Sequence, residues 1–149
     1  MVGDDTDLKL RTLDRVYNKI DKLYGGFAYS CGVSSCAYWM LFEISHRGSV
    51  ALVELTDAWS YSKQTINSAL KSLQEKGLVD VCFCEGSRKN KVASLTDEGK
   101  EFAAKYLDPA EKAERRAFER LKPGERELIA DLMEKYASYL DDELQKVSI

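Results

Sequence analysis

The sequence predicts a mainly α-helical fold that carries one small β-hairpin. Most of the 149 residues fall into segments whose apolar side chains recur at helical spacing. Residues 78–84 and 91–95 instead alternate in hydrophobicity and are rich in strand formers, and the polar residues 85–90 between them are typical of a hairpin turn. Two helices joined by a short polar turn come directly before this hairpin. Helix, turn, helix and hairpin in this order form a winged helix-turn-helix.

Two further helices are predicted at the start of the chain. Residues 8–27 carry a wide apolar stripe at helical spacing and are expected to form the first helix, although the glycine pair 25–26 weakens its end. Residues 30–34 are predicted to be a loop. Residues 35–46 are predicted to form the second helix, which Gly48 ends.

The helix-turn-helix itself is predicted within residues 49–77. A short helical pattern is closed by Trp59, and the polar turn that follows ends at Ser62, whose hydroxyl can accept a backbone N–H as a helix cap. Gly77 ends the second of the two helices, because glycine enters the left-handed conformation without a Cβ clash. The apolar positions of this helix share one face: Ile66, Ala69, Leu70 and Leu73.

The opposite face of the same helix is predicted to contact DNA. Amide side chains bond adenine bidentately, lysine reaches guanine or phosphate, and threonine bonds a base edge or touches a thymine methyl. No acidic residue, which would repel phosphate, precedes Glu75 on this helix. An ordinary solvated helix face is the plain alternative. The predicted contacts are Ser62, Lys63, Gln64, Thr65, Asn67, Ser68 and Lys71.

The hairpin tip concentrates positive charge. It carries Arg88, Lys89 and Lys91, so the hairpin is predicted to be a wing that holds the DNA backbone or enters the minor groove. The whole chain has a net charge of −3, but residues 60–91 hold six basic residues against three acidic ones. A basic reading surface on an acidic scaffold predicts salt-sensitive binding.

Helices are predicted again after the hairpin. Thr96 caps this region, Asp108-Pro109 starts a new segment or kinks a long helix, and residues 125–147 form the last helix. The first and last helices carry more apolar surface than a compact winged helix buries. A second copy of the chain is expected to bury this apolar surface in a homodimer, which is the commonest kind of oligomer. The alternative is a monomer whose end helices pack within the same chain. A homodimer predicts a pseudo-palindromic operator with half-sites about one DNA turn apart.

Short motifs link the reading helix, the hairpin and the helix that follows. They are Ser62-Lys63-Gln64-Thr65-Ile66, then Leu70-x-x-Leu73-x-x-Lys76-Gly77-Leu78-Val79, and finally Leu95-Thr96-x-x-Gly99. In combination they resemble the multiple-antibiotic-resistance-regulator (MarR) family of bacterial transcription factors, and with the flanking helices the resemblance covers nearly the whole chain. There is one departure. Many members carry an acidic residue before the two basic ones at the wing tip, where this sequence has Ser87.

The resemblance implies a single domain, residues 1–149, with a winged helix-turn-helix at 35–98 and dimerisation helices at 1–30 and 100–149. It also implies an aromatic pocket for a small aromatic or phenolic effector. Ligand binding there would release the DNA, as in a repressor. The candidate lining residues are Tyr24, Phe27, Tyr38, Trp39 and Trp59.

The four cysteines are predicted to be reduced, small hydrophobic residues. Cys31 and Cys36 form a Cys-x4-Cys spacing, and Cys82 and Cys84 form Cys-x-Cys, neither of which is the usual Cys-x2-Cys zinc pattern. Neither a metal nor another cofactor is expected. A redox switch at Cys31 or Cys36 and a metal site are the alternatives.

Composition and motifs favour binding over catalysis. The one histidine, His46, stands at a predicted helix end, and the sequence lacks a phosphate loop, a nucleophile elbow and a zinc-protease helix. No apolar run approaches the ~20 residues that span a bilayer, and no signal-peptide pattern appears, so a soluble cytoplasmic protein is expected. Two rivals to a ligand-controlled DNA regulator stay open: a redox-sensing regulator of the same fold, and a winged-helix protein-interaction module without a DNA target.

Overall fold

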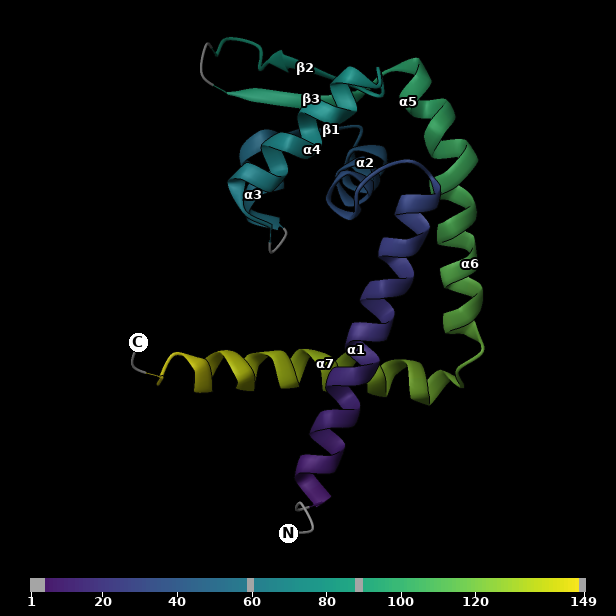
Figure 1. Cartoon of the computed structure of the whole chain (residues 1–149), viewed down its shortest axis with the longest axis vertical. Coiled ribbons are helices and arrows are strands. Elements are labelled where there is room, and N and C mark those ends of the chain that lie inside the picture. The colour runs from purple at the N-terminus through teal and green to yellow at the C-terminus, as the bar shows by residue number, and fades with distance from the viewer. Residues whose placement is uncertain (1–4, 59–60, 88–89, 148–149) are drawn as a thin grey trace. The chain divides into compact units, whose positions relative to one another are not determined.

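The computed structural model describes residues 5–58, 61–87 and 90–147, which form helices and a small antiparallel sheet (Figure 1). The chain divides into two compact units, Met1–Leu107 and Asp108–Ile149. The predicted fold class, mainly α with a winged helix-turn-helix, is confirmed. In chain order the elements are α1 (Asp5–Ser30), α2 (Ser35–Arg47), β1 (Ser49–Ala51), α3 (Leu52–Ala58), α4 (Lys63–Glu75), β2 (Val79–Phe83), β3 (Lys91–Leu95), α5 (Asp97–Phe102), a π-helical turn (Ala103–Leu107), α6 (Asp108–Glu119) and α7 (Pro123–Leu144).

Helix α2 is the centre of the first unit. Leu41 and Ile44 on this helix are fully buried, and the helix contacts α1, α4, β1 and β3. The Ser34 hydroxyl caps α2 by accepting the Ala37 N–H at 3.2 Å. Gly48, at φ 76°, ends the helix as the sequence predicts. The apolar core of the winged helix is therefore built around this one element.

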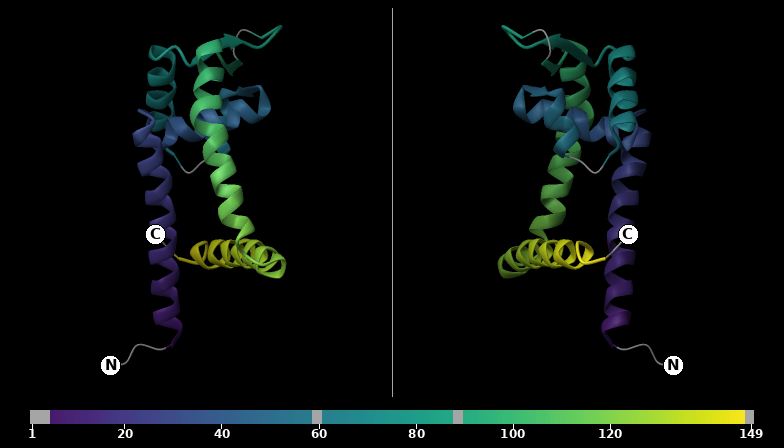
Figure 2. Two further views of the ribbon diagram at one scale, coloured as in Figure 1. Left: turned by 90° about the vertical axis from the view of Figure 1, so that its right-hand side faces the viewer. Right: turned by 90° about the vertical axis from the view of Figure 1, so that its left-hand side faces the viewer.

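Helix α1 is longer than the sequence predicts, because it continues through the glycine pair at 25–26 to Ser30. A Cβ on Gly25 would lie 3.1 Å from the Ser35 Oγ, so glycine lets α1 pass close to the start of α2. Toward its N-terminus α1 extends as a rod away from the rest of its unit (Figure 2). Ala28 is the one buried residue in the described helix.

The sheet has the strand order β1-β3-β2, and both pairings are antiparallel. The hairpin pairs Val79 with Leu95 at its base and Phe83 with Lys91 near its tip, which confirms the predicted strands. Strand β1 was not predicted. It is three residues long and forms by pairing with β3, a contact between distant segments that no local alternation reveals.

Helix α4 ends in a Schellman motif. The Leu78 N–H donates to the Leu73 carbonyl at 2.9 Å, and the Gly77 N–H donates to the Gln74 carbonyl at 2.9 Å. Gly77 supplies the left-handed conformation that the motif needs, with φ 68°. The predicted stop is confirmed, and β2 begins two residues later.

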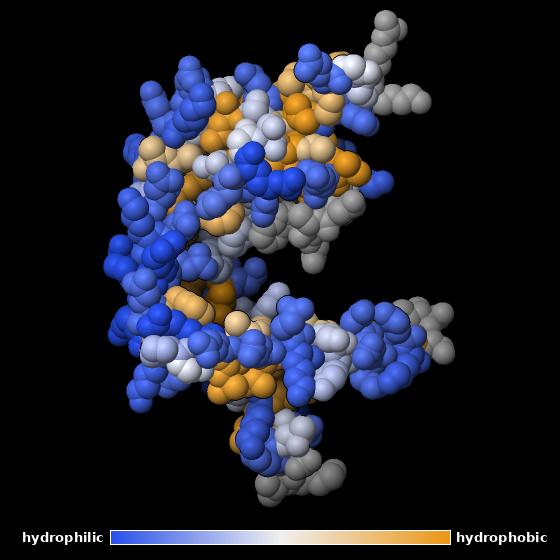
Figure 3. All heavy atoms as spheres, turned by 180° about the vertical axis from the view of Figure 1, so that it is seen from behind, coloured by the Kyte–Doolittle hydropathy of each residue, from blue (hydrophilic) through white to orange (hydrophobic). Residues whose placement is uncertain are grey.

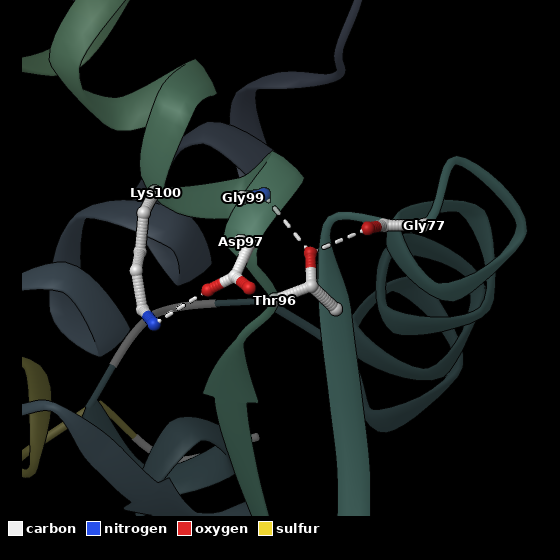
Figure 4. Close-up of polar contacts among 5 residues, drawn as sticks. All are labelled: Gly77, Thr96, Asp97, Gly99 and Lys100. Atoms are coloured by element: carbon white, nitrogen blue, oxygen red, sulfur yellow. Dashed lines mark hydrogen bonds and ion pairs between the residues drawn. The ribbon is translucent and has the colours of Figure 1, made fainter.

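Thr96 joins the end of α4 to the start of α5 (Figure 4). Its hydroxyl donates to the Gly77 carbonyl at 2.5 Å and accepts the Gly99 N–H at 2.9 Å. Its own N–H donates to the Leu78 carbonyl at 3.2 Å. The predicted cap is therefore present and also bonds a second element. These four residues, Gly77, Leu78, Thr96 and Gly99, are called the Thr96 junction below.

Gly99 is buried, and the space beside it is filled by backbone. A Cβ at this position would lie 2.0 Å from the Leu78 carbonyl oxygen and 3.3 Å from the Leu95 Cβ. Backbone cannot move aside as a flexible side chain can. Only glycine at position 99 therefore allows α5 to approach Leu78, the residue between the end of α4 and β2, this closely.

Helices α6 and α7 form the second unit. Glu125 caps α7 by accepting the Lys122 N–H at 2.8 Å, and Arg126 donates to the Leu121 carbonyl at 2.9 Å, so both residues fix the turn between the helices. Pro123 stands in the first turn of α7, so the last helix begins two residues before the predicted start at 125.

Two helices keep apolar stripes on the surface. Apolar side chains reach the surface at several places on the helices (Figure 3). The exposed members on α1 are Leu8, Leu10, Val16, Tyr17, Ile20, Leu23 and Phe27, and those on α7 are Leu128, Ile129, Leu132, Met133, Tyr136, Tyr139, Leu140 and Leu144.

Gly99→Ala is expected to destabilise the protein by about 1–3 kcal/mol, because the added methyl overpacks against backbone. Gly26→Ala is the matched control: nothing lies within 4 Å of a Cβ there, and this helical site should gain about 0.5–1 kcal/mol. Urea unfolding measures both changes. Equal effects of the two substitutions would contradict the close approach at Gly99.

Candidate nucleic-acid interface

The N-terminus of α4 is held by the cap that the sequence predicts. The Ser62 hydroxyl accepts the Thr65 N–H at 3.1 Å and lies 2.8 Å from the Thr65 hydroxyl. On the inner face of the helix Ile66, Ala69 and Leu73 are buried. The cap and the buried face together fix which side chains α4 presents to solvent.

The structure brings the predicted contacts of α4 together on its outer surface. They combine hydroxyl, amide and ammonium groups, which can bond base edges and phosphates. Lys71 lies 3.7 Å from Glu75, and both side chains are largely exposed, so this ion pair holds the lysine only weakly. The exposed residues are Ser62, Lys63, Gln64, Thr65, Asn67, Ser68 and Lys71.

The wing turn closes with backbone bonds and one serine. The Cys84 N–H donates to the Asn90 carbonyl at 2.8 Å, and the Ser87 N–H donates to the Cys84 carbonyl at 2.9 Å. The Ser87 hydroxyl accepts the Asn90 N–H at 3.0 Å, so the side chain that departs from the expected wing-tip acid holds the turn through a hydroxyl. Arg88 and Lys89 lie outside the described residues.

The hairpin projects beyond the helices of its unit (Figures 1 and 2). Lys91 is exposed near its tip, with its Nζ 5.3 Å from the centre of the Phe83 ring. The sequence pattern alone does not identify Phe83 as the partner of this lysine. Only the strand register, which pairs the two residues directly, reveals the contact.

Helix α3 packs against α4. Leu55 of α3 is buried in the core, and Arg47 at the end of α2 donates to the Glu54 carboxylate at 2.8 Å. Both side chains of this ion pair are about half exposed. The sheet adds a further constraint, because β1 runs directly into α3.

Four of the five predicted pocket residues gather in one aromatic cluster between α1 and α2. The ring centres of Tyr24 and Trp39 are 5.0 Å apart, those of Phe27 and Tyr38 are 5.9 Å apart, and those of Tyr38 and Trp39 are 5.4 Å apart. Phe42, which the sequence analysis missed, extends the cluster at 5.7 Å from Trp39. Phe42 follows Trp39 by three residues on α2, and this helical spacing, which places both rings on one face, is the sequence feature that predicts the contact. The fifth predicted residue, Trp59, lies outside the described residues.

His46 continues this line of rings along α2. Its ring centre lies 4.2 Å from that of Phe42, and its Nδ1 lies 2.9 Å from the Phe42 carbonyl oxygen. The residue is exposed in the last turn of the helix. This position agrees with the surface and helix-end role that the sequence suggests.

Burial disfavours the ionised forms of three groups near the aromatic cluster. It raises the pKa of the Cys31 thiol, against the opposing effect of a hydrogen bond with the Ser30 side chain, and it raises the pKa of the Cys36 thiol. It also raises the pKa of the Tyr61 hydroxyl, to which the charges of Cys36 and Asp21 add. Tyr61 packs against the core directly before the Ser62 cap.

Two further sequence expectations concern metals and membranes. Within residues 5–58, 61–87 and 90–147, no three His, Cys, Asp or Glu side chains are grouped as metal ligands. Across the same part of the chain, no helix combines the length and the apolar character that crossing a bilayer requires.

Comparison with known proteins identifies one family match and several similar folds. Residues 32–89 match the MarR family. The structure of AbsC, a MarR family transcriptional regulator from Streptomyces coelicolor, has a TM-score of 0.79 at 22% identity, with 93% of this chain and 97% of that chain covered. Sco3205, a MarR family regulator from the same organism in complex with DNA, has a TM-score of 0.70 at 22% identity, with 87% of each chain covered.

A third similar structure concerns the regulation of DNA binding by 6-hydroxynicotinic acid. It is BpsR from Bordetella bronchiseptica, with a TM-score of 0.65 at 18% identity, and the match covers 85% of this chain and 98% of that chain. At these identities the structural likeness shows a common fold. A comparison with curated protein sequences finds no significant match.

Cys82 is expected to react with iodoacetamide faster than Cys31 or Cys36 at neutral pH. Cys82 is exposed, whereas burial raises the pKa of the other two thiols and so lowers their thiolate fraction at a given pH. Timed alkylation followed by peptide mass spectrometry measures the order, with urea-unfolded protein as the control. Faster alkylation of Cys31 or Cys36 would favour the thiol-switch alternative instead.

Proposed function

We propose that this chain, which matches the MarR family over residues 32–89 and has the fold of MarR family transcriptional regulators, is a homodimeric, sequence-specific DNA-binding protein. It acts in the cytoplasm as a repressor and releases its operator when a small aromatic or phenolic ligand binds. It works by binding alone, without catalysis. The whole chain, residues 1–149, serves this function as one MarR-like domain.

The outer surface of α4 carries this proposal. Gln64 and Asn67 present amides in the N-terminal half of the helix, and Lys63 and Lys71 flank them with exposed ammonium groups. An exposed helix with these groups fits the major groove, where amides bond adenine and lysine bonds guanine or phosphate. The wing adds Lys91 on the same winged helix for a backbone contact.

The apolar stripes of the end helices support a homodimer. Leu23 on α1 is 64% exposed and Leu132 on α7 is 53% exposed, and each lies within a longer apolar row. A second copy covers both rows with identical surfaces, as in most symmetric oligomers. In this proposal residues 1–30 and 100–149 provide the interface. The winged helices at 35–98 then occur in pairs and suit a pseudo-palindromic operator.

The aromatic cluster between α1 and α2 supports a ligand of matching chemistry. Tyr24, Phe27, Tyr38 and Trp39 bring aromatic rings and two phenol groups together, a side-chain chemistry that suits a flat aromatic acid or phenol. The BpsR structure concerns a ligand of this class. Because α2 also packs against α4, ligand binding that favours a different α2 position would change the spacing of the reading helices.

Gln64→Ala and Asn67→Ala are expected to cost about 1–3 kcal/mol on the best operator and to relax the base preference at the positions they contact. Lys71→Ala should instead weaken all duplexes alike and lower the salt slope by about one, because a phosphate contact carries no sequence information. Selection from genomic fragments, then titration on the selected duplex, measures both effects. An unchanged base preference in both amide variants would remove α4 from sequence reading.

Leu132→Glu is expected to raise the dimer dissociation constant by about two orders of magnitude or more, because an unpaired buried carboxylate costs about 3 kcal/mol or more. Ser138→Glu is the matched control, since it adds the same charge to α7 away from the apolar stripe. Sedimentation velocity measures both variants. A wild-type chain that sediments as a monomer would contradict the proposed interface.

A further inference from the structure

Phe83 is a large apolar side chain at the exposed end of the wing. Val79, Val81 and Phe83 alternate along β2 and share the face of the sheet that packs on the core. Along this row the exposed fraction rises from 2% at Val79 to 56% at Phe83. The inner face of the sheet thus continues beyond the core and presents a phenyl ring to solvent.

Lys91 stands directly opposite Phe83 on β3. Directly opposed residues of an antiparallel pair project from the same face, and the Lys91 Nζ lies 5.3 Å from the centre of the Phe83 ring. This is the range in which a ring face attracts a cation. The bond from the Cys84 N–H to the Asn90 carbonyl, at 2.8 Å, adjoins the pair and fixes its register.

The described side chains around Lys91 do not neutralise its positive charge. Among the described side chains no carboxylate lies within ion-pair distance of its Nζ. Asp80 and Cys82 alternate with the Phe83 row and so point to the other face of β2. The ring is a neutral partner: it restricts the lysine without cancelling the charge that a phosphate would bind.

We propose that Phe83 is a positioning residue for DNA binding, whose ring holds the Lys91 ammonium in place for a phosphate of the duplex. A free lysine loses rotamer freedom when it binds, and a lysine already held against a ring loses less. This inference rests on the proposed function, because it assigns a role within the same interface. The shared face, the register and the ring-to-cation distance carry it.

A double-mutant cycle tests the role on a short random-sequence duplex, since a phosphate contact does not depend on base sequence. Phe83→Leu should weaken binding by about two- to five-fold, the size of an exposed cation–π contact. The same substitution should have no effect in a Lys91→Met background, because the ammonium is gone. Phe83→Tyr keeps the ring face and should bind as the unmodified chain does. Fluorescence anisotropy at several salt concentrations measures affinity and salt slope, and circular dichroism verifies the fold of each variant.

The outcomes separate this inference from the proposed function. If Lys91→Met weakens binding and Phe83→Leu leaves it unchanged, or weakens it equally in both backgrounds, the positioning role is wrong and the DNA interface stands. If the unmodified chain binds no duplex, the proposed function fails and this role fails with it. Loss on Phe83→Leu that depends on Lys91 and is restored in Phe83→Tyr supports the role.

Discussion

The close contact between the start of α5 and the end of α4 is the constraint on which the geometry of the winged helix depends. At this point the Thr96 hydroxyl bonds both Gly77 and Gly99, and the Leu78 carbonyl accepts the Thr96 N–H. The Schellman end of α4, the first residue before β2 and the cap of α5 are therefore one hydrogen-bonded structure. A side chain at 99 would separate them, since its Cβ would lie 2.0 Å from backbone oxygen.

The Thr96 junction explains how a small unit can hold in register the two elements that are proposed to contact DNA. Helix α4 is fixed at its start by Ser62 and at its end by the junction, while its inner face packs against α2. The hairpin begins at the junction and returns to it, because β3 leads directly into Thr96. Helix α2 then links this assembly to the aromatic cluster, so a change at the cluster has a packed route to α4. In the proposed function, this route is the physical basis for coupling ligand binding to DNA binding.

Local chemistry made much of this fold predictable. Ser62 and Gly77 mark the two ends of α4 because a hydroxyl cap and a left-handed glycine act within a few residues of themselves. Alternation likewise predicted β2 and β3. The features that the sequence did not reveal are contacts between distant segments: strand β1, the passage of α1 over Ser35 at Gly25, and the place of Phe83 opposite Lys91. Each depends on register or on close approach in three dimensions. In the candidate site, helical spacing was enough to predict which residues of α4 face outward. It could not predict that the Ser87 hydroxyl holds the wing turn.

The proposed function requires an acidic chain to bind a polyanion. Residues 60–91 hold six basic residues against three acidic ones, so the charge of this stretch is opposite in sign to the total of −3. The proposed function depends on paired winged helices held at a fixed separation. Hydroxyl-radical footprinting on a selected genomic fragment tests it most directly. The account predicts two protected patches on one face of the duplex, centred about one helical turn apart; a single patch, or uniform cleavage at every protein concentration, would contradict it.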